Sequence, residues 1–490
     1  MTRAFFSTLS VIVISSLSVT PARSAGADKV PITTSSPRAL ELYLHARDLQ
    51  EKLRAQEARA DLQEAVKQDP NFAMGYLNLA FSQATTDGFF ETLEKAVSLA
   101  PGVSEGERLW IRGVEAGVDG LSAKQRELYE ALVAAYPNDE RAHNLLGNHH
   151  FGQQDYASAI ASYEKAIAIN PEFSQPYNQL GYSHRFMGNY SDAEKAFQKY
   201  VELIPADPNP HDSYAELLMK MGELERSIEH YRKALAINKK FMPSYLGIAT
   251  DLNLMEKHEE ARQVLDEMTQ EAADDGQRRQ ALFARAVSYM DQGDTENALR
   301  AFDQEFALAK KHADVAAMAF DLNNMGTVLL EAGRANEAMA KFAESIAKTR
   351  ESDRTEDARE NAERVFLFNS ARAALALNDL TSAKTKADAL RQQAEKTGNQ
   401  PQIQLAHQLA GHIALAERNH DTALHELEQA NQLDPYVLFQ MGLAYEGKGD
   451  AAKARELFRK AADFNALNSL NYAFIRRRAR EKGQAEGASG

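Results

Sequence analysis

The sequence predicts an all-α solenoid, in which pairs of antiparallel helices stack one after another along the chain. Two observations lead to this prediction: helix-favouring residues dominate the composition, and small and large side chains recur at intervals of 34 residues. Pro and Gly are sparse, at 14 and 26 of 490 residues, and the abundant Ala, Leu, Glu, Gln, Lys and Arg lose little on entering a helix. An interval of 34 residues fits one helix–turn–helix unit that packs on its neighbours.

Composition and charge exclude several classes of function. The chain is 44% hydrophobic and 26% charged, which is typical of a globular protein. Its net charge of -14 argues against a general nucleic-acid binder and against a surface held to anionic lipid by charge. The absence of cysteine excludes disulfides, zinc–thiolate sites and a thiol nucleophile.

The N-terminus has the pattern of a secretory signal peptide. Arg3 supplies the positive start, Phe5–Val19 form a short apolar core, and Ala22–Ala27 offer small residues for cleavage after Ser24 or Ala27. The apolar run is shorter than the roughly 20 residues of a membrane span. The sequence therefore predicts export to the periplasm or outside a bacterial cell, with no membrane span after signal removal; an uncleaved anchor is the alternative.

The repeat is clearest in the middle of the chain. Small residues mark each second helix at Ala159, Ala193, Ser227 and Ala261, and a large residue follows four positions later at Tyr163, Phe197, Tyr231 and Leu265. Small residues also precede each anchor by twelve positions, at Gly147, Gly181, Ala215 and Ala249. Small residues are expected where two helices cross closely, and large residues are expected to fill the space between neighbouring units.

This spacing resembles the tetratricopeptide repeat. One unit carries the pattern at His143, Leu146, Gly147, His150, Ala159, Tyr163, Ala166 and Pro171. The next carries it at Tyr177, Leu180, Gly181, His184, Ala193, Phe197, Tyr200 and Pro205. The resemblance implies a right-handed superhelix whose first helices line a concave surface. The stretch Tyr177–Leu235 is also similar to a group of exported bacterial tetratricopeptide proteins.

The predicted organisation follows from the changing period. After residue 273 the intervals between anchors become irregular and mostly longer, up to 45 residues, which predicts longer helices. The predicted segments are a signal peptide (1–27), a linker (28–37), irregular repeat-like helix pairs (38–137), a regular 34-residue array (138–273), a longer-period array (274–466), a capping helix (467–480) and a disordered tail (481–490).

Two catalytic motifs match by pattern but not by context. Gly102–Gly106 reads G-x-S-x-G, yet Pro101 and a helix precede it where a nucleophile elbow needs a strand. Ser104 is therefore predicted to be the N-cap of a helix that starts near Glu105. Gly442–Gly449 resembles a phosphate loop but lacks the final Ser or Thr that would hold magnesium, and the repeat accounts for its glycines.

Clustered histidines could indicate a metal site, but the rest of the sequence does not support one. The histidines that cluster are His143, His149, His150, His184, His407 and His412. No H-E-x-x-H pattern occurs, and no carboxylate spacing completes a ligand set, so packed and hydrogen-bonded histidines are predicted. We predict no catalytic residue, no metal and no cofactor.

The predicted binding surface is the concave face of the regular units. Its inner positions combine side-chain amides, which both donate and accept, with aromatic residues and arginines that are favoured in binding centres. The candidates are Arg141, Asn144, Asn148, Phe151, Gln175, Asn178, Tyr182, Arg185, Phe186, Asp212, Glu216 and Lys220. Family members that clamp a C-terminal carboxylate use Lys and Arg beside Asn here; Asp212 and Glu216 argue against such a clamp. Ordinary solvated helix faces are the alternative.

Three functions are compatible with these observations. The first is a non-enzymatic scaffold of the cell envelope that binds segments of partner proteins on its concave face. The second is an accessory or sensor subunit of an envelope enzyme or assembly complex whose activity lies in a partner chain. The third, an enzyme with an unrecognised site, is disfavoured because the repeats occupy nearly all of the chain.

Overall fold

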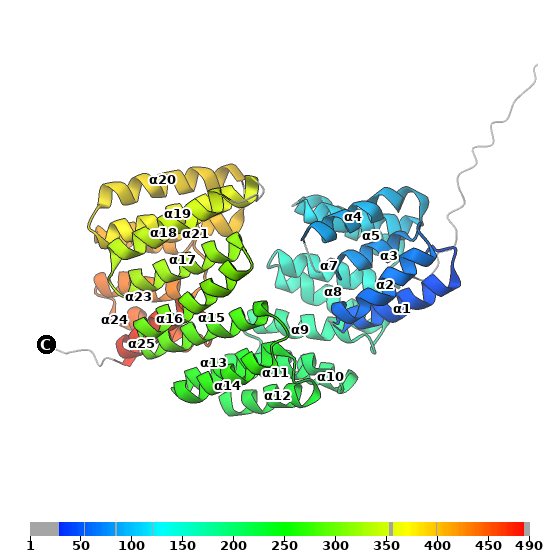
Figure 1. Cartoon of the computed structure of the whole chain (residues 1–490), viewed down its shortest axis with the longest axis horizontal. Helices are drawn as coiled ribbons and strands as arrows, with labels where there is room; N and C mark the ends of the chain where they lie inside the picture. The colour runs from blue at the N-terminus through cyan, green and yellow to red at the C-terminus, as the bar shows by residue number, and fades with distance from the viewer. Residues whose placement is uncertain are drawn as a thin grey trace, which may run out of the picture. The chain divides into compact units, whose positions relative to one another are not determined.

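The structure of the protein, a computed structural model, describes residues 29–52, 54–83, 86–119, 121–351, 356–397 and 399–484. The predicted signal peptide and residues 485–490 of the predicted tail lie outside these ranges. Within them the chain forms 25 α-helices and one 3-10 turn, with no strand (Figure 1). The predicted all-α array of tandem helix pairs is confirmed.

The chain divides into two compact units, with the division between Met187 and Gly188. The helices of unit 1 are α1 (Pro37–Glu51), α2 (Ala55–Gln68), α3 (Ala73–Ala80), α4 (Thr86–Leu99), α5 (Glu105–Val118), α6 (Ser122–Ala135), α7 (Glu140–Gly152), α8 (Tyr156–Ile169) and α9 (Ser174–Phe186), with the 3-10 turn at Ala100–Gly102. Each odd-numbered helix packs on the even-numbered helix that follows it, from α1 with α2 to α7 with α8.

Unit 2 contains the remaining sixteen helices of the described residues. They are α10 (Tyr190–Leu203), α11 (Pro208–Lys220), α12 (Leu224–Ile237), α13 (Met242–Leu254), α14 (His258–Glu271), α15 (Asp275–Gln292), α16 (Thr295–Lys311), α17 (Val315–Glu331), α18 (Ala335–Arg350), α19 (Glu356–Ala376), α20 (Leu380–Thr397), α21 (Gln400–Ala416), α22 (His420–Leu427), α23 (Pro435–Gly447), α24 (Ala451–Ala462) and α25 (Leu470–Gln484).

Helix length follows the period of the sequence. Helices α7 to α14 have 13 or 14 residues each, whereas α15 to α21 have 16 to 21. The lengthening begins at α15, just after residue 273, where the regular period ends. No helix in the described part of the chain is long and apolar enough to cross a membrane.

Local sequence starts the helices at defined residues. Asp139 caps α7, because its side chain accepts hydrogen bonds from the amides of Arg141 and Ala142. Ser104 caps α5 as predicted and forms a capping box with Glu107, in which each side chain bonds the backbone amide of the other residue. This cap accounts for the serine of the G-x-S-x-G pattern.

Each pair is held by close approach at the small residue of its first helix. A Cβ built on Gly147 of α7 would lie 2.5 Å from the Tyr163 ring of α8, so only hydrogen fits there. Gly442 of α23 has the same relation to Phe458 of α24, at 2.6 Å. The glycine that opens the loop-like stretch Gly442–Gly449 therefore serves helix packing, as the repeat predicts.

The predicted linker is ordered over its described part. Residues 29–36 run as an extended segment, here called the strap, across the ends of three helix pairs of unit 1. The strap donates its backbone amides to carboxylates: Val30 N to Asp139 Oδ2 at 2.8 Å, Thr33 N to Glu107 Oε1 at 2.7 Å, and Ser35 N to Asp69 Oδ2 at 2.8 Å. Acceptors spread from residue 69 to residue 139 are thus joined by one short segment.

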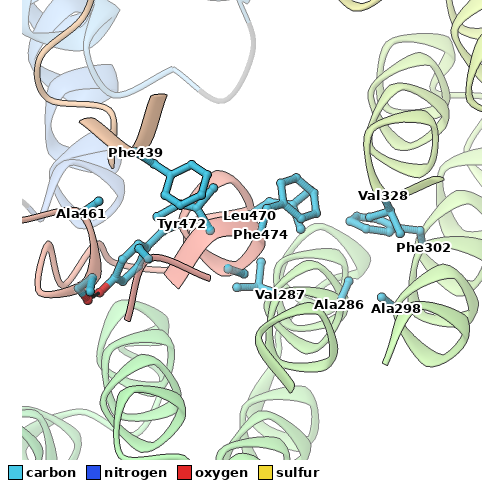
Figure 2. Packing of buried hydrophobic residues seen from close by; sticks show 14 of the residues in the cluster. Ala286, Val287, Ala298, Phe302, Val328, Phe439, Ala461, Leu470, Tyr472 and Phe474 are labelled. Carbon is cyan, nitrogen blue, oxygen red and sulfur yellow. Dashed lines mark hydrogen bonds between the residues drawn. The ribbon is translucent and has the colours of Figure 1, made fainter. Parts of the chain in front are cut away.

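The last helix, α25, belongs to the core of unit 2. It begins at Leu470, three residues after the predicted start of the capping helix, and continues to Gln484, into the predicted tail. It packs on α24, on the nearby α23 and on α15, which lies far earlier in the chain. Figure 2 shows its side chains Leu470, Tyr472 and Phe474 in one cluster with Phe439 of α23 and Val287 of α15.

Candidate functional site

A cavity of about 540 Å³ lies in unit 1 and is the candidate site. Its walls come mainly from the first helices of successive pairs, α1, α3, α5 and α7, with contributions from α6 and from the start of α9. This is the side of the repeats that the sequence predicts to be concave. The volume lies within the range of cavities that hold small ligands or a few residues of a peptide.

One part of the cavity wall is apolar. Leu77 and Phe81 of α3 and Trp110, Val114 and Val118 of α5 contribute to it. Phe81 is 54% exposed and Val118 is 38% exposed, so both present apolar surface to solvent. Exposed aromatic surface beside a cavity is typical of a binding site.

Charged residues line another part of the cavity wall, and their hydrogen bonds connect α1 to α7 of the fourth helix pair. Glu51 at the end of α1 accepts two hydrogen bonds from Arg141 of α7, at 2.6 Å from Nε and 3.0 Å from Nη2. Arg141 also donates to Glu140 at 2.6 Å, and Arg47 lies 3.7 Å from Glu51. Burial opposes the charge of Arg141, but the bonds to Glu51 and the nearby carboxylates outweigh it and raise the pKa of the guanidinium.

Asn144 brings an unused acceptor to the cavity. The side chain lines the cavity and is only 4% exposed. Its Nδ2 donates to Gln175 Oε1 of the next repeat at 3.0 Å, whereas its Oδ1 accepts no hydrogen bond from the described residues. Buried amide oxygens are rarely left without a donor, so this position is suited to a donor from a ligand. Asn148, by contrast, accepts from the Tyr163 hydroxyl at 2.9 Å.

The structure brings four of the twelve predicted residues together at the cavity. These are Arg141, Asn144, Asn148 and Gln175. Five others of unit 1 lie outside its wall, namely Phe151, Asn178, Tyr182, Arg185 and Phe186. The aromatic members pack on each other, with ring centroids 5.9 Å apart between Phe151 and Phe186, and the Arg185 guanidinium lies 4.9 Å from the Tyr182 ring.

The remaining three lie on α11 of unit 2. Asp212 is 5% exposed and accepts a hydrogen bond from Ser244 of the next repeat at 2.6 Å. Burial, with the nearby Glu216, raises the pKa of Asp212 to about 7. Lys220 donates to the Phe464 carbonyl and lies 3.5 Å from the centroid of that ring. Asp212 and Lys220 are therefore engaged within unit 2 itself.

Several first helices of unit 2 contact α25. Arg476 of α25 donates to the carbonyls of Asn253 and Leu254 at the end of α13 and to the carboxylate of Asp291 on α15. Arg478 of α25 reaches Glu331 at the end of α17. The chain's own last helix thus occupies the side of unit 2 that corresponds to the cavity of unit 1.

Sequence reasoning missed the N-terminal half of the cavity. Arg47, Glu51, Phe81 and Trp110 lie on pairs whose spacing departs from 34 residues, so the inner positions could not be counted there. Trp110 could have been recognised as a candidate, because it is the one tryptophan of the chain and lies on the first helix of a pair.

Histidines have local partners. His407 lies 2.7 Å from Glu426, and His143 lies 3.0 Å from the Pro137 carbonyl. Burial lowers the pKa of His412 to about 3, which keeps that ring neutral. In the described ranges, no three His, Asp or Glu side chains converge as a metal ligand set.

Family models match three parts of the chain. Residues 140–173 and 436–466 each match a tetratricopeptide-repeat model, and residues 177–310 match the middle TPR-like domain of cilia and flagella-associated protein 70. No curated protein matches the chain.

Solved structures with similarity to the chain also include repeat proteins. A tetratricopeptide repeat protein from Parabacteroides merdae is 15% identical, over 55% of this chain and 98% of that one, with a TM-score of 0.37. The MamA protein is 19% identical over 34% and 91%, with a TM-score of 0.31. YrrB, described as a TPR protein with an unusual peptide-binding site, is 17% identical over 38% and 94%, with a TM-score of 0.28.

The repeat geometry and the family models agree on the same residues. Residues 140–173, matched as one repeat, contain α7 and α8 with the Gly147–Tyr163 contact. Residues 436–466 contain most of α23 and all of α24 with the Gly442–Phe458 contact. The chain is a tetratricopeptide-repeat protein.

Proposed function

We propose that this protein is a non-enzymatic scaffold of the cell envelope that binds a segment of a partner protein in the cavity of unit 1. The observation that carries the proposal is the contrast between the units. Unit 1 presents a cavity of about 540 Å³ with an exposed apolar wall and an unused buried acceptor. In unit 2 the first helices α13, α15 and α23 contact α25.

The chemistry of the wall favours a peptide over a reacting substrate. Peptide segments offer apolar side chains together with main-chain N–H donors, which Phe81 and the Asn144 oxygen can respectively bind. Cavity residues with charges are tied to each other, as Arg141 is to Glu51, rather than arranged as an acid and a base around an empty position.

A photo-crosslinking residue at position 81 tests the proposal. Phe320 of α17 is the matched control, because it is 53% exposed against 54% for Phe81 and lies in unit 2. Crosslinks in whole cells at position 81, mapped to one segment of one partner and absent at position 320, support the proposal. Equal crosslinking at both positions, or none at position 81, contradicts it.

The identity of the crosslinked partner also separates the two non-enzymatic functions. A partner that carries out envelope catalysis or assembly supports the accessory or sensor role. Several unrelated partners that crosslink through the same type of segment support a general scaffold.

Export is tested separately by the mass of the purified protein's N-terminal peptide. A mature start at residue 25 or 28 supports it, and an intact Met1–Ala27 segment contradicts cleavage.

A further inference from the structure

A row of alternating charges runs into the cavity of unit 1. Lys29 of the strap bonds Glu140, Glu140 bonds Arg141 at 2.6 Å, and Arg141 bonds Glu51 at 2.6 Å. The row ends at Arg47, whose Nε lies 3.7 Å from Glu51. Three cations therefore alternate with two carboxylates, and the members of the row that line the cavity are two arginines, Arg47 and Arg141, and one carboxylate, Glu51.

Arg47 is held more loosely than the other arginine of the row. Arg141 makes three hydrogen bonds to carboxylates, at 2.6 to 3.0 Å. Arg47 has its longer ion contact with Glu51 and a hydrogen bond to the Tyr43 side chain, whose ring centroid lies 5.7 Å from the guanidinium. A guanidinium carries five N–H donors, so Arg47 can bind a further carboxylate without breaking the row.

The other two binding elements lie on the same cavity. Phe81, Trp110 and Val118 form apolar surface that an aromatic side chain can cover. Asn144 Oδ1 is buried and accepts no hydrogen bond from the part of the chain that the structure describes, which suits a main-chain N–H. A cavity of about 540 Å³ limits the occupant to a few residues.

We propose that the cavity binds a short internal segment of a partner protein in which an acidic side chain stands next to an aromatic one. The carboxylate binds Arg47, the aromatic ring covers Phe81 and Trp110, and a main-chain N–H donates to Asn144. This inference rests on the proposed function of the cavity and defines the class of segment that the cavity selects.

The single tryptophan of the chain provides the measurement. Trp110 lies in the cavity wall and no other tryptophan contributes to the signal, so its fluorescence reports on occupation of the cavity. The protein is titrated with the tetrapeptide Gly-Asp-Phe-Gly, acetylated and amidated so that its ends are uncharged. Two matched peptides replace Asp by Asn or Phe by Ala. The expected result is saturable binding of the first peptide, about tenfold tighter than either matched peptide.

Variants assign the preference to Arg47. In Arg47→Gln the Asp and Asn peptides are expected to bind equally, whereas the control Arg38→Gln, on the exposed side of the same helix, keeps the tenfold preference. Unchanged thermal unfolding of both variants shows that the fold is intact. Persistence of the Asp preference in Arg47→Gln overturns the proposal.

Two further outcomes are decisive. If no peptide alters Trp110 fluorescence while crosslinking at position 81 succeeds, the acidic–aromatic segment is wrong and the proposed function stands. If Gly-Asn-Phe with a free C-terminal carboxylate binds as tightly as the capped Asp peptide, a chain terminus is the ligand, and the internal segment is overturned.

Discussion

The guanidinium of Arg476 is bonded to the carboxylate of Asp291, a residue 185 positions earlier, with Nε 2.7 Å from Oδ1. The two side chains are 4% and 7% exposed. Burial opposes charge on both groups, yet their mutual bonds raise the pKa of Arg476 and, together with His258, lower the pKa of Asp291. This pair anchors α25 against α15.

We expect Arg476→Met to destabilise unit 2 by about 3–5 kcal/mol, because it leaves the Asp291 carboxylate buried without its main partner. Urea unfolding followed by circular dichroism measures the loss. Arg477→Met is the matched control, since the neighbouring Arg477 side chain is 67% exposed, and its substitution should change the free energy of unfolding by less than about 0.5 kcal/mol. Equal effects of the two substitutions would refute the anchoring role.

Close packing in the repeat predicts the effect of adding one methyl group. Gly147→Ala places a carbon 2.5 Å from the Tyr163 ring and should destabilise unit 1 by about 1–3 kcal/mol. Gly152→Ala, at the end of the same helix, meets nothing within 4 Å and should be neutral or stabilise by up to about 1 kcal/mol. Thermal unfolding of both variants tests the contrast, which disappears if the helices of a pair are loosely packed.

The strap should contribute to the stability of unit 1. Glu107→Ala removes the capping box of α5 and the acceptor of both the amide and the hydroxyl of Thr33, whereas Ser104→Ala removes the cap bond and one longer strap contact, of 3.5 Å, to the Pro31 carbonyl. Loss of the cap bond should cost about 1 kcal/mol, and the glutamate substitution should cost more. Proteolysis of residues 29–36 should also become faster in Glu107→Ala than in Ser104→Ala. Equal stability and equal cleavage in the two variants would show that the strap adds nothing.

Unit 2 should lose stability as the pH rises towards 8. Burial raises the pKa of Asp251 to about 8, with Ser227 lowering it and Glu225 raising it further. Between the ordinary pKa near 4 and this value, the folded state holds a proton that the unfolded state releases. The free energy of unfolding should therefore fall with rising pH, by up to about 1.4 kcal/mol per pH unit from this group.

Asp251→Asn isolates that contribution. The amide cannot ionise, so the variant should show a shallower pH dependence and should be more stable than the parent near pH 8. Unfolding midpoints in urea at several values between pH 5 and pH 8 give the comparison. Parallel curves for parent and variant would mean that Asp251 does not retain its proton in the folded state.

The 34-residue period was sufficient to predict the repeats, the close glycine contacts and four of the cavity residues. Inner positions such as Asn144 and Gln175 could be counted because their units are regular. The positions of Arg47 and Phe81 could not be counted, because the first helix pairs are irregular. Where these two residues lie depends on how α1 packs against α7 through the bonds between Glu51 and Arg141.

Long-range contacts were the part that local patterns could not show. Residues 28–37 have the Pro, Ser and Thr content of a linker, and only the fold places Asp69, Glu107 and Asp139 where their carboxylates accept the strap amides. The run of arginines at residues 476–480 gave no sign that Arg476 would be buried and bonded to α13 and α15.

Because α25 is the last helix of the chain, it can pack on unit 2 only after the other helices of the unit have been synthesised. Synthesis runs from the N-terminus, so α13 and α15 emerge well before the helix that covers them. Until residues 470–484 are made, the Asp291 carboxylate and the apolar side chains of Val287 and Leu322 have no partner in α25. Contacts across such sequence separations form slowly. The surface of unit 2 that α25 covers therefore stays exposed to solvent until the end of the chain has been synthesised.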